Sequence, residues 1–150
     1  MRTPTRNPFQ HPDNPVQPGD GGSEGGLEVT AIEQVERVDQ PWGHEEIFAL
    51  VEGRYVGKLL HINAGRALPL QRHQTTIVTI SVQSGRIRVE HGPDAQHLEI
   101  LTLGPGERLL IRTGVVHRIT ALSTTRTLAV STAQPGWRQD AVHIQDPNSR

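Results

Sequence analysis

Short apolar alternations, separated by glycine, proline and asparagine, constrain this chain more than any other feature. From Trp42 onward, hydrophobic residues recur at every second position over segments of about five to seven residues, which is the period of a strand with one buried face. Pairs such as Ser84-Gly85 supply turns between these segments. No window has a helical period of ordinary length. The pattern therefore predicts an all-β closed barrel or jelly roll, with strands at residues 46–51, 56–62, 76–82, 86–90, 98–103, 108–111, 117–122 and 127–132.

The N-terminal part of the chain has a different composition. Residues 1–26 are mostly Pro, Gly, Asn, Gln and Asp, with too few apolar side chains to offset the entropy of ordering. We expect a disordered, solvated tail there rather than a polyproline ligand. Residues 27–39 form a lead-in segment whose apolar positions fit either a strand or a short helix. The barrel domain is expected to span residues 40–150.

Charge and composition exclude several function classes. The 15 Lys plus Arg residues and 16 Asp plus Glu residues leave a formal net charge of -1, so nucleic acid and anionic membranes are not expected partners. With no cysteine in the chain, any metal must be held by histidine, carboxylate or amide oxygen. No apolar stretch is long enough to span a bilayer, and no apolar run follows the first arginines. We expect a soluble cytoplasmic protein.

Two segments carry the spacing of a known pair of motifs. Residues 65–73, followed by Val78 and Gly85, match the first cupin motif at every marked position. Residues 106–121, which include His117, match the second motif, although Arg112 replaces its customary proline and Ala121 its customary asparagine. The chain therefore resembles the cupin superfamily, which implies a single jelly-roll barrel. In that family two histidines and an acidic residue hold a metal inside the barrel.

The residues themselves place a site in the same region. Side chains alternate along a strand, so Gln71 and His73 project to one face, and His117 shares its face with Ile119 and Ala121. Two imidazoles and an amide oxygen can thus converge in an apolar interior. A lone histidine is more often a core residue satisfied by a neighbour, but two of them at these positions favour a site.

A closer resemblance extends over residues 40–150. Segments 40–45, 55–58, 68–73, 105–107, 114–118 and 140–146 are similar to the cupin domain of type II phosphomannose isomerases. This resemblance implies metal-assisted aldose–ketose isomerisation of a sugar or sugar phosphate, in a homodimer. By position, Gln71, His73 and His117 look like ligands of a divalent metal such as zinc, manganese or iron. Lys58 looks like the catalytic lysine that faces the pocket, although its side chain could instead extend to solvent from the strand end.

The sequence departs from that family at three places. The acidic metal ligand falls at Val78, the His-Trp pair that follows it falls at Thr79-Ile80, and the arginine near the C-terminus falls at His143. Without a carboxylate the donor set loses charge, so metal affinity should fall and the choice of metal is open.

No other residue replaces the missing acid in the sequence pattern. Glu90 and His91 lie at a strand end and turn, where we expect them to be exposed, and His61 lies on the face opposite Lys58. The arginines near the proposed site alternate away from it or lie in turns, and are expected to be surface or interface charges: Arg72, Arg112 and Arg118.

Three functions follow from these observations. The first is a sugar-phosphate isomerase or epimerase with a weakened metal site. The second is a cupin without catalysis that binds a sugar or nucleotide sugar, or regulates a partner enzyme. The third is an iron-dependent dioxygenase, which is less favoured because such cupins usually contribute three histidines.

Overall fold

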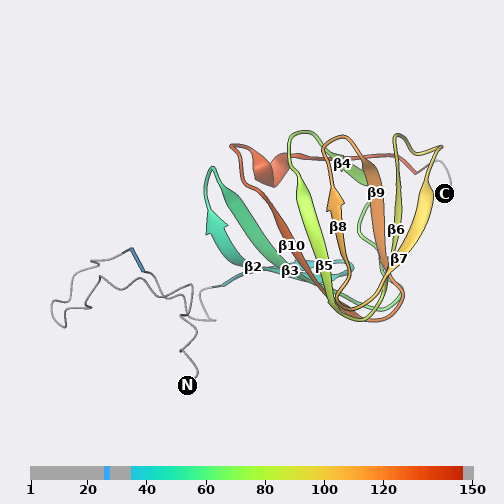
Figure 1. The fold of residues 1–150 in the computed structure, drawn as a ribbon, viewed down its shortest axis with the longest axis horizontal. Helices are drawn as coiled ribbons and strands as arrows, with labels where there is room; N and C mark the ends of the chain where they lie inside the picture. The colour runs from blue at the N-terminus through green and yellow to red at the C-terminus, as the bar shows by residue number, and fades with distance from the viewer. Residues whose placement is uncertain (1–25, 28–34, 147–150) are drawn as a thin grey trace, which may run out of the picture. The chain divides into compact units, whose positions relative to one another are not determined.

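In the computed structural model, which describes residues 26–27 and 35–146, the alternating segments form two antiparallel sheets (Figure 1). The fold described is that of the unit spanning residues 31–150. The first sheet has six strands in the order β1-β2-β3-β10-β5-β8. Their bounds are β1 Glu36–Gln40, β2 Gly43–Val51, β3 Tyr55–Ile62, β10 Thr125–Thr132, β5 Val78–Ser84 and β8 Arg108–Ile111.

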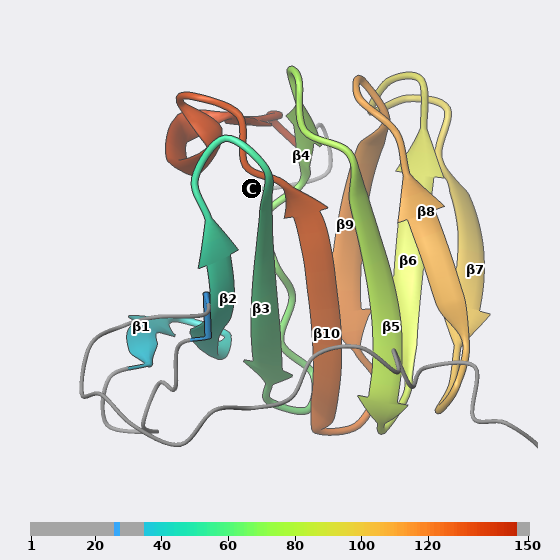
Figure 2. The ribbon, with the colours of Figure 1, turned by 60° about the vertical axis from the view of Figure 1, so that its left-hand side comes forward.

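The second sheet has five strands in the order β11-β4-β9-β6-β7. Figure 2 shows β9, β6 and β7 behind the strands of the first sheet, so that the two sheets enclose the interior between them. A single turn of 3₁₀ helix, η2 (Trp137–Gln139), connects β10 to β11. The bounds of the second sheet are β11 Ala141–His143, β4 Gln71–His73, β9 Val116–Ala121, β6 Ile87–Gly92 and β7 Glu99–Leu103.

All eight strands expected from the alternation are present, and each begins and ends within a few residues of its expected bounds. The all-β prediction is confirmed. The lead-in segment contributes β1, which pairs with β2, so a strand rather than a helix forms at residues 36–40. The pattern did not predict β4 and β11 as strands of a sheet. Both have three residues, which is too short for a period of two to be recognised.

The core forms where inward-facing residues of the two sheets meet. On β5 the burial alternates, with Val78, Ile80 and Val82 buried and the residues between them facing outward. On β6 the residues Ile87 and Val89 are fully buried. Burying a side chain of this size contributes roughly 1.5 to 3 kcal/mol, so the alternation itself drives the two sheets together.

A tight turn closes one end of the sandwich at Gly85, between β5 and β6. Its φ is +80°, and a Cβ atom placed there would lie 2.5 Å from the carbonyl oxygen of Thr124. Only glycine fits such a position without displacing the neighbouring backbone. The turn predicted at Ser84-Gly85 therefore lies in close contact with the turn that connects β9 to β10.

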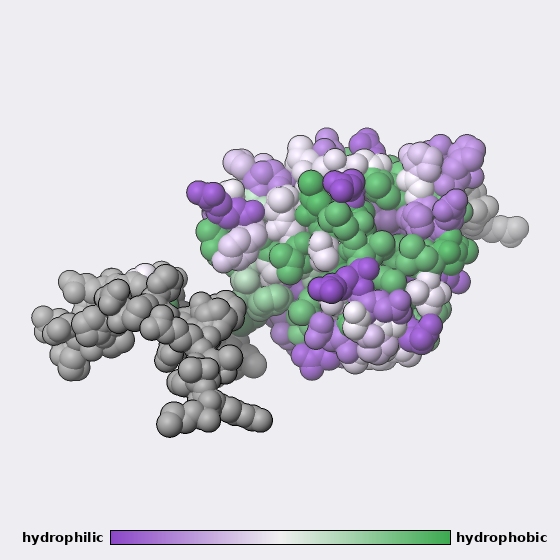
Figure 3. Space-filling model, viewed as in Figure 1, coloured by the Kyte–Doolittle hydropathy of each residue, from purple (hydrophilic) through white to green (hydrophobic). Residues whose placement is uncertain are grey.

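The outer face of the six-stranded sheet carries exposed apolar side chains. Figure 3 shows them gathered across the middle of one face, over β10, β5 and β8, with hydrophilic groups above and below. The large apolar residues of this sheet with at least a third of their surface exposed lie on β2, β3, β8 and β10, and include Phe48, Tyr55, Leu110 and Val130.

The expected tail at 1–26, except Gly26, and residues 28–34 of the lead-in lie outside the described residues. Disorder of the tail therefore stays a prediction. Among the described residues, no helix has the length and apolar character needed to cross a membrane.

Candidate functional site

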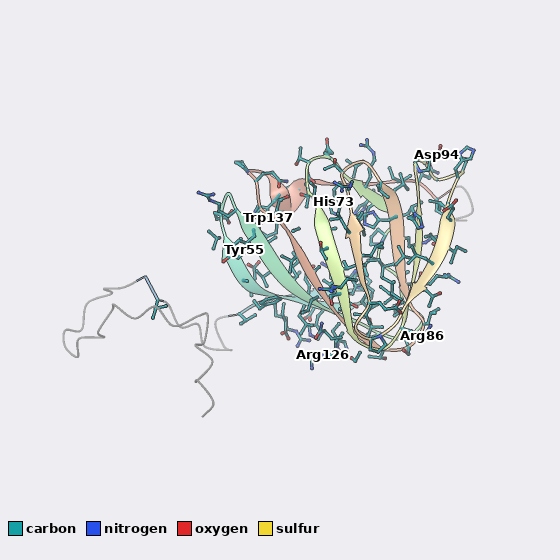
Figure 4. The ribbon with its side chains drawn as sticks, viewed as in Figure 1. Tyr55, His73, Arg86, Asp94, Arg126 and Trp137 are labelled. Atoms are coloured by element: carbon teal, nitrogen blue, oxygen red, sulfur yellow. The ribbon has the colours of Figure 1, made fainter. Side chains whose placement is uncertain are left out.

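A cavity of about 130 Å³ lies between the two sheets, near one end of the sandwich. Figure 4 shows His73 at this end, together with Trp137, whereas Arg86 and Arg126 mark the opposite end. Apolar side chains from β3, β5, β8 and β9 form most of the wall, and polar side chains enter from β2, β3, β4 and β9. The polar residues that line the cavity are Glu45, Lys58, Gln71, His73, Thr76, His117 and Ser131.

The pairing of β4 with β9 brings the predicted residues together. Gln71 lies directly opposite His117 in the antiparallel register, and His73 lies two residues further along β4. The imidazole rings of His73 and His117 have centroids 5.5 Å apart and are tilted by 32°. The three side chains proposed from spacing alone therefore line one cavity, and Val78, which takes the place of the family's acidic ligand, lines the same cavity.

His117 is held in one tautomer by the backbone. Its side chain is almost fully buried, and its Nδ1 lies 3.0 Å from the carbonyl oxygen of Val115. A carbonyl oxygen only accepts hydrogen bonds, so Nδ1 must carry the proton. Burial lowers the pKa of His117, and the hydrogen bond to Val115 opposes this shift only in part. The ring is therefore neutral at neutral pH.

His73 has an ionised neighbour behind it. Its Nδ1 lies 3.8 Å from a carboxylate oxygen of Asp140, and this nitrogen is buried without a hydrogen-bond partner among the described residues. Burial lowers the pKa of His73, and the nearby His117 and Lys58 lower it further, while Asp140 opposes them. His73 is thus also neutral at neutral pH, so two uncharged imidazoles face one cavity.

Asp140 fastens the segment that follows β10 to the loop that follows β4. Its carboxylate accepts hydrogen bonds from the backbone N–H of Thr75 at 3.0 Å and of Thr76 at 2.8 Å, and from the Thr75 hydroxyl at 2.6 Å. Burial alone would raise the pKa of Asp140, but these hydrogen bonds hold it well below its usual range. The amide of Gln134 donates to both threonine hydroxyls at 2.8 Å, which completes the clamp.

Lys58 reaches the cavity from β3, as the resemblance implies, and does not extend away from it. Its Nζ lies 3.6 Å from a carboxylate oxygen of Glu45 on β2 and 5.4 Å from the centroid of the Trp137 ring. Trp137 in turn donates from Nε1 to Glu52 at 3.1 Å. Lys58 is therefore neutralised by a partner on the cavity wall.

The donor set does not fit a tightly held divalent metal. Gln71, His73 and His117 are all neutral, and the position that could add a carboxylate beside them holds Val78. Among residues 26–27 and 35–146, no group of three His, Cys, Asp or Glu side chains is arranged to hold a metal ion. A cation would thus meet three uncharged donors in a largely apolar cavity. Glu45, the carboxylate among the described lining residues, is already paired with Lys58 and so does not offset the dehydration of a cation.

Sequence reasoning missed two acidic residues of the site. Glu45 lies one residue before the expected strand, and its signals were its place in the similar segment 40–45 and its shared strand face with the buried Ile47. Asp140 contacts residues 65 positions away in the chain, so no local pattern could reveal it. His61 lies outside the cavity as expected, where its ring stacks on that of His44 with centroids 5.0 Å apart.

The expectation that Glu90 is exposed was wrong. Its side chain is only 15% exposed, because its carboxylate accepts a hydrogen bond from Nε of Arg118 at 2.6 Å. Arg118 also donates from an Nη to Asp146. This arginine therefore ties β9 to β6 and to the C-terminal segment, and it is not a free surface charge.

Comparisons with known proteins identify the fold. No protein-family model matches the chain, and no curated protein matches it by sequence. Among solved structures, the Streptomyces nucleoside dehydratase Pac13, solved with uridine, is 12% identical, with a TM-score of 0.65 and coverage of 80% of this chain and 92% of Pac13.

Two larger proteins also share the architecture. The oxalate decarboxylase of Bacillus subtilis, described with Mn(II) centres, is 13% identical with a TM-score of 0.64 over 77% of this chain and 32% of its own. The capsular polysaccharide assembling protein CapF of Staphylococcus aureus is 16% identical with a TM-score of 0.57 over 77% and 32%. The chain thus spans about a third of these two proteins. The likeness shows that it has the cupin fold. The finer resemblance to the phosphomannose isomerase domain stays a prediction.

Proposed function

We propose that the cavity binds a small polyhydroxylated compound, a sugar or a sugar-like ring, without a resident metal. The observation that carries this proposal is the set of uncharged hydrogen-bonding side chains that β4 and β9 bring into a mostly apolar cavity: Gln71, His73 and His117. Sugar rings combine hydroxyl groups with apolar C–H faces. Ligand sites of this kind have mostly apolar walls and a few placed polar groups.

The charge of the cavity favours an uncharged ligand group over a phosphate. Lys58 is the single cationic side chain among the described residues that line the cavity, and Glu45 already neutralises it. Arg118, the arginine nearest in sequence to His117, is bound to Glu90 and Asp146. A sugar phosphate or nucleotide sugar would therefore place its ring in the cavity and leave its phosphate at the solvent side.

A specific observation supports a catalytic variant of this proposal, an isomerase or epimerase. Both imidazoles have a lowered pKa, so each is unprotonated at neutral pH and can accept a proton from a bound hydroxyl or carbon acid. Lys58 in its protonated form can supply one. The structural neighbours include a nucleoside dehydratase and a capsular polysaccharide assembling protein, and this likeness supports the proposal of sugar-related chemistry. A dioxygenase has no such support, because among the described residues two histidines and not three line the cavity.

Calorimetric titration tests the binding proposal. Untagged protein, treated with a chelator and measured for metal content, is titrated with mannose, fructose, their 6-phosphates and uridine. We expect binding of at least one compound by metal-free protein, and its loss in Gln71→Leu but not in the matched variant His61→Leu outside the cavity. Binding that appears only after zinc or manganese is added would overturn the metal-independent site. The homodimer and the cytoplasmic location stay predictions.

A further inference from the structure

The carboxylate of Asp140 lies near only one of the two ring nitrogens of His73, Nδ1. Asp140 is 7% exposed and is fixed by the donors of Thr75 and Thr76, so its position is set by the fold. The residue after it, Ala141, pairs with His73 across β11 and β4. The carboxylate and the imidazole are therefore held at a fixed separation by the sheet.

A fixed anion selects the tautomer of the neutral ring beside it. If the proton is on Nδ1, the N–H dipole points toward the carboxylate; if it is on Nε2, the Nδ1 lone pair faces a negative charge inside the protein, which is unfavourable. The distance of 3.8 Å between Nδ1 and the carboxylate oxygen is longer than a hydrogen bond. Such contacts are often long in a free site and shorten when a ligand binds.

The same tautomer is present at His117 for an independent reason, the hydrogen bond from its Nδ1 to the carbonyl oxygen of Val115. Two separate parts of the fold thus favour the proton on Nδ1: a hydrogen bond at His117 and a nearby carboxylate at His73. Each ring is left with an unprotonated Nε2, and both rings line the cavity 5.5 Å apart.

We infer, on the basis of the proposed function, that Asp140 is a positioning residue that keeps His73 protonated at Nδ1, so that the cavity presents two acceptor nitrogens and selects ligands with two neighbouring hydroxyl donors. An ionised carboxylate has only acceptor atoms, so its oxygens would face the lone pairs of the two nitrogens. The amide of Gln71, opposite His117 in the register, offers both a donor and an acceptor to the same ligand.

Nitrogen NMR of histidine side chains tests the tautomer directly. In ¹⁵N-labelled wild-type protein at neutral pH, we expect both His73 and His117 to carry the proton on Nδ1. In Asp140→Asn we expect His73 to shift toward the Nε2-protonated form, since the anion is gone, while His117 stays unchanged as an internal reference. A wild-type His73 protonated on Nε2 would overturn the inference, even if Asp140→Asn did not fold.

Binding measurements separate a positioning role from a structural one. Thr75→Val is the matched control, because it removes the hydroxyl bonded to Asp140 but keeps the carboxylate and the backbone donors. We expect about tenfold or greater loss of affinity in Asp140→Asn and a smaller loss in Thr75→Val, with the His73 tautomer unchanged in the latter. Equal losses with the wild-type tautomer in both variants would show that Asp140 only holds the loop.

Matched ligands test the selectivity. Uridine is compared with 2′-deoxyuridine, which lacks one of the two neighbouring hydroxyl groups of the ribose. We expect the deoxy compound to bind about tenfold or more weakly to wild type. If none of the titrated compounds binds wild type although His73 is protonated on Nδ1, the proposed function fails while the role of Asp140 stands. If a ligand and its deoxy analogue bind equally, the selectivity is wrong while the proposed site stands.

Discussion

The two ends of the sandwich are built from the same strands but have different interiors. At the end closed by Gly85, the inward-facing residues Ile62, Val82, Ile87 and Val89 are fully buried and pack against one another. At the other end the same strands leave a cavity of about 130 Å³, lined in part by polar side chains.

This difference separates the end of the sandwich where packing stabilises the fold from the end where a cavity can bind a ligand. At the closed end the inward positions hold apolar side chains or threonines, which are fully buried. At the cavity end a few inward positions carry Gln71, His73, His117 and Lys58, which have hydrogen-bonding capacity left over. We therefore expect substitutions at the closed end to act on stability and those at the cavity end to act on binding.

The largest effect is expected at the closed end, for Ile87→Ala. Ile87 is fully buried, so the variant loses the transfer free energy of the side chain and leaves a void, at a cost of about 4 kcal/mol in the free energy of unfolding. Urea denaturation measures it. The matched control, Ile100→Ala at a position 63% exposed, should change stability little. Similar losses in the free energy of unfolding in both variants would contradict the placement of Ile87 in a tightly packed core.

Val78→Glu tests the cavity end next. The carboxyl group would enter the cavity beside His73 and His117, and keeping it protonated at pH 7 costs about 3 kcal/mol in chelator. A divalent metal that binds the new carboxylate and the imidazoles should restore much of this stability through mass action. Thermal melts with chelator and with zinc or manganese decide the outcome. Equal destabilisation in both would show that the three side chains do not share a cavity.

Asp140→Asn should cost about 2 kcal/mol, because a buried charged acceptor of several hydrogen bonds is lost. The pKa of Asp140 is lowered in the folded state, so its contribution is fully present above the unfolded value of about 3.8 and is lost as pH falls below it. The stability difference between wild type and variant should therefore be largest near pH 6 to 7 and shrink below about pH 4. Denaturation midpoints are measured across this pH range. A difference that does not change with pH would show that the ionised carboxylate of Asp140 does not stabilise the fold.

Thr127→Val should stabilise the protein by about 1 kcal/mol. Thr127 is fully buried, and its hydroxyl has no hydrogen-bond partner among the described residues. Valine keeps the shape of the side chain and removes the unsatisfied group. The same change at the exposed Thr102 of β7 serves as the control and should be close to neutral. A destabilised Thr127→Val would mean that the hydroxyl has a partner such as a bound water.

His117→Leu should change the free energy of unfolding least, by less than about 1 kcal/mol, because the apolar side chain offsets the lost hydrogen bond to Val115. The same variant should abolish ligand binding in calorimetry. A large loss of stability with binding retained would show that His117 stabilises the fold and does not bind the ligand, which contradicts the role assigned to the cavity end.

Much of the fold could be predicted from the chain because its strands follow a local rule. Alternation along 78–82 and 116–121 follows directly from the period of the strand and identifies the inward residues, including Val78 and His117. Motif spacing likewise pointed to Gln71 and His73. Short elements such as β4 and β11 could not be predicted, since three residues carry no period and the strands form only against their partners.

The sequence by itself determined the all-β class, the main strands and the residues that can face the interior, because these depend on neighbours one or two positions away. Only the tertiary structure decided which charged side chains are paired with a partner. Glu45 neutralises Lys58, Arg118 is bound by Glu90 and Asp146, and Asp140 reaches back to Thr75. These pairs join segments far apart in the chain, and electrostatic attraction depends on distance in space, which no local pattern encodes.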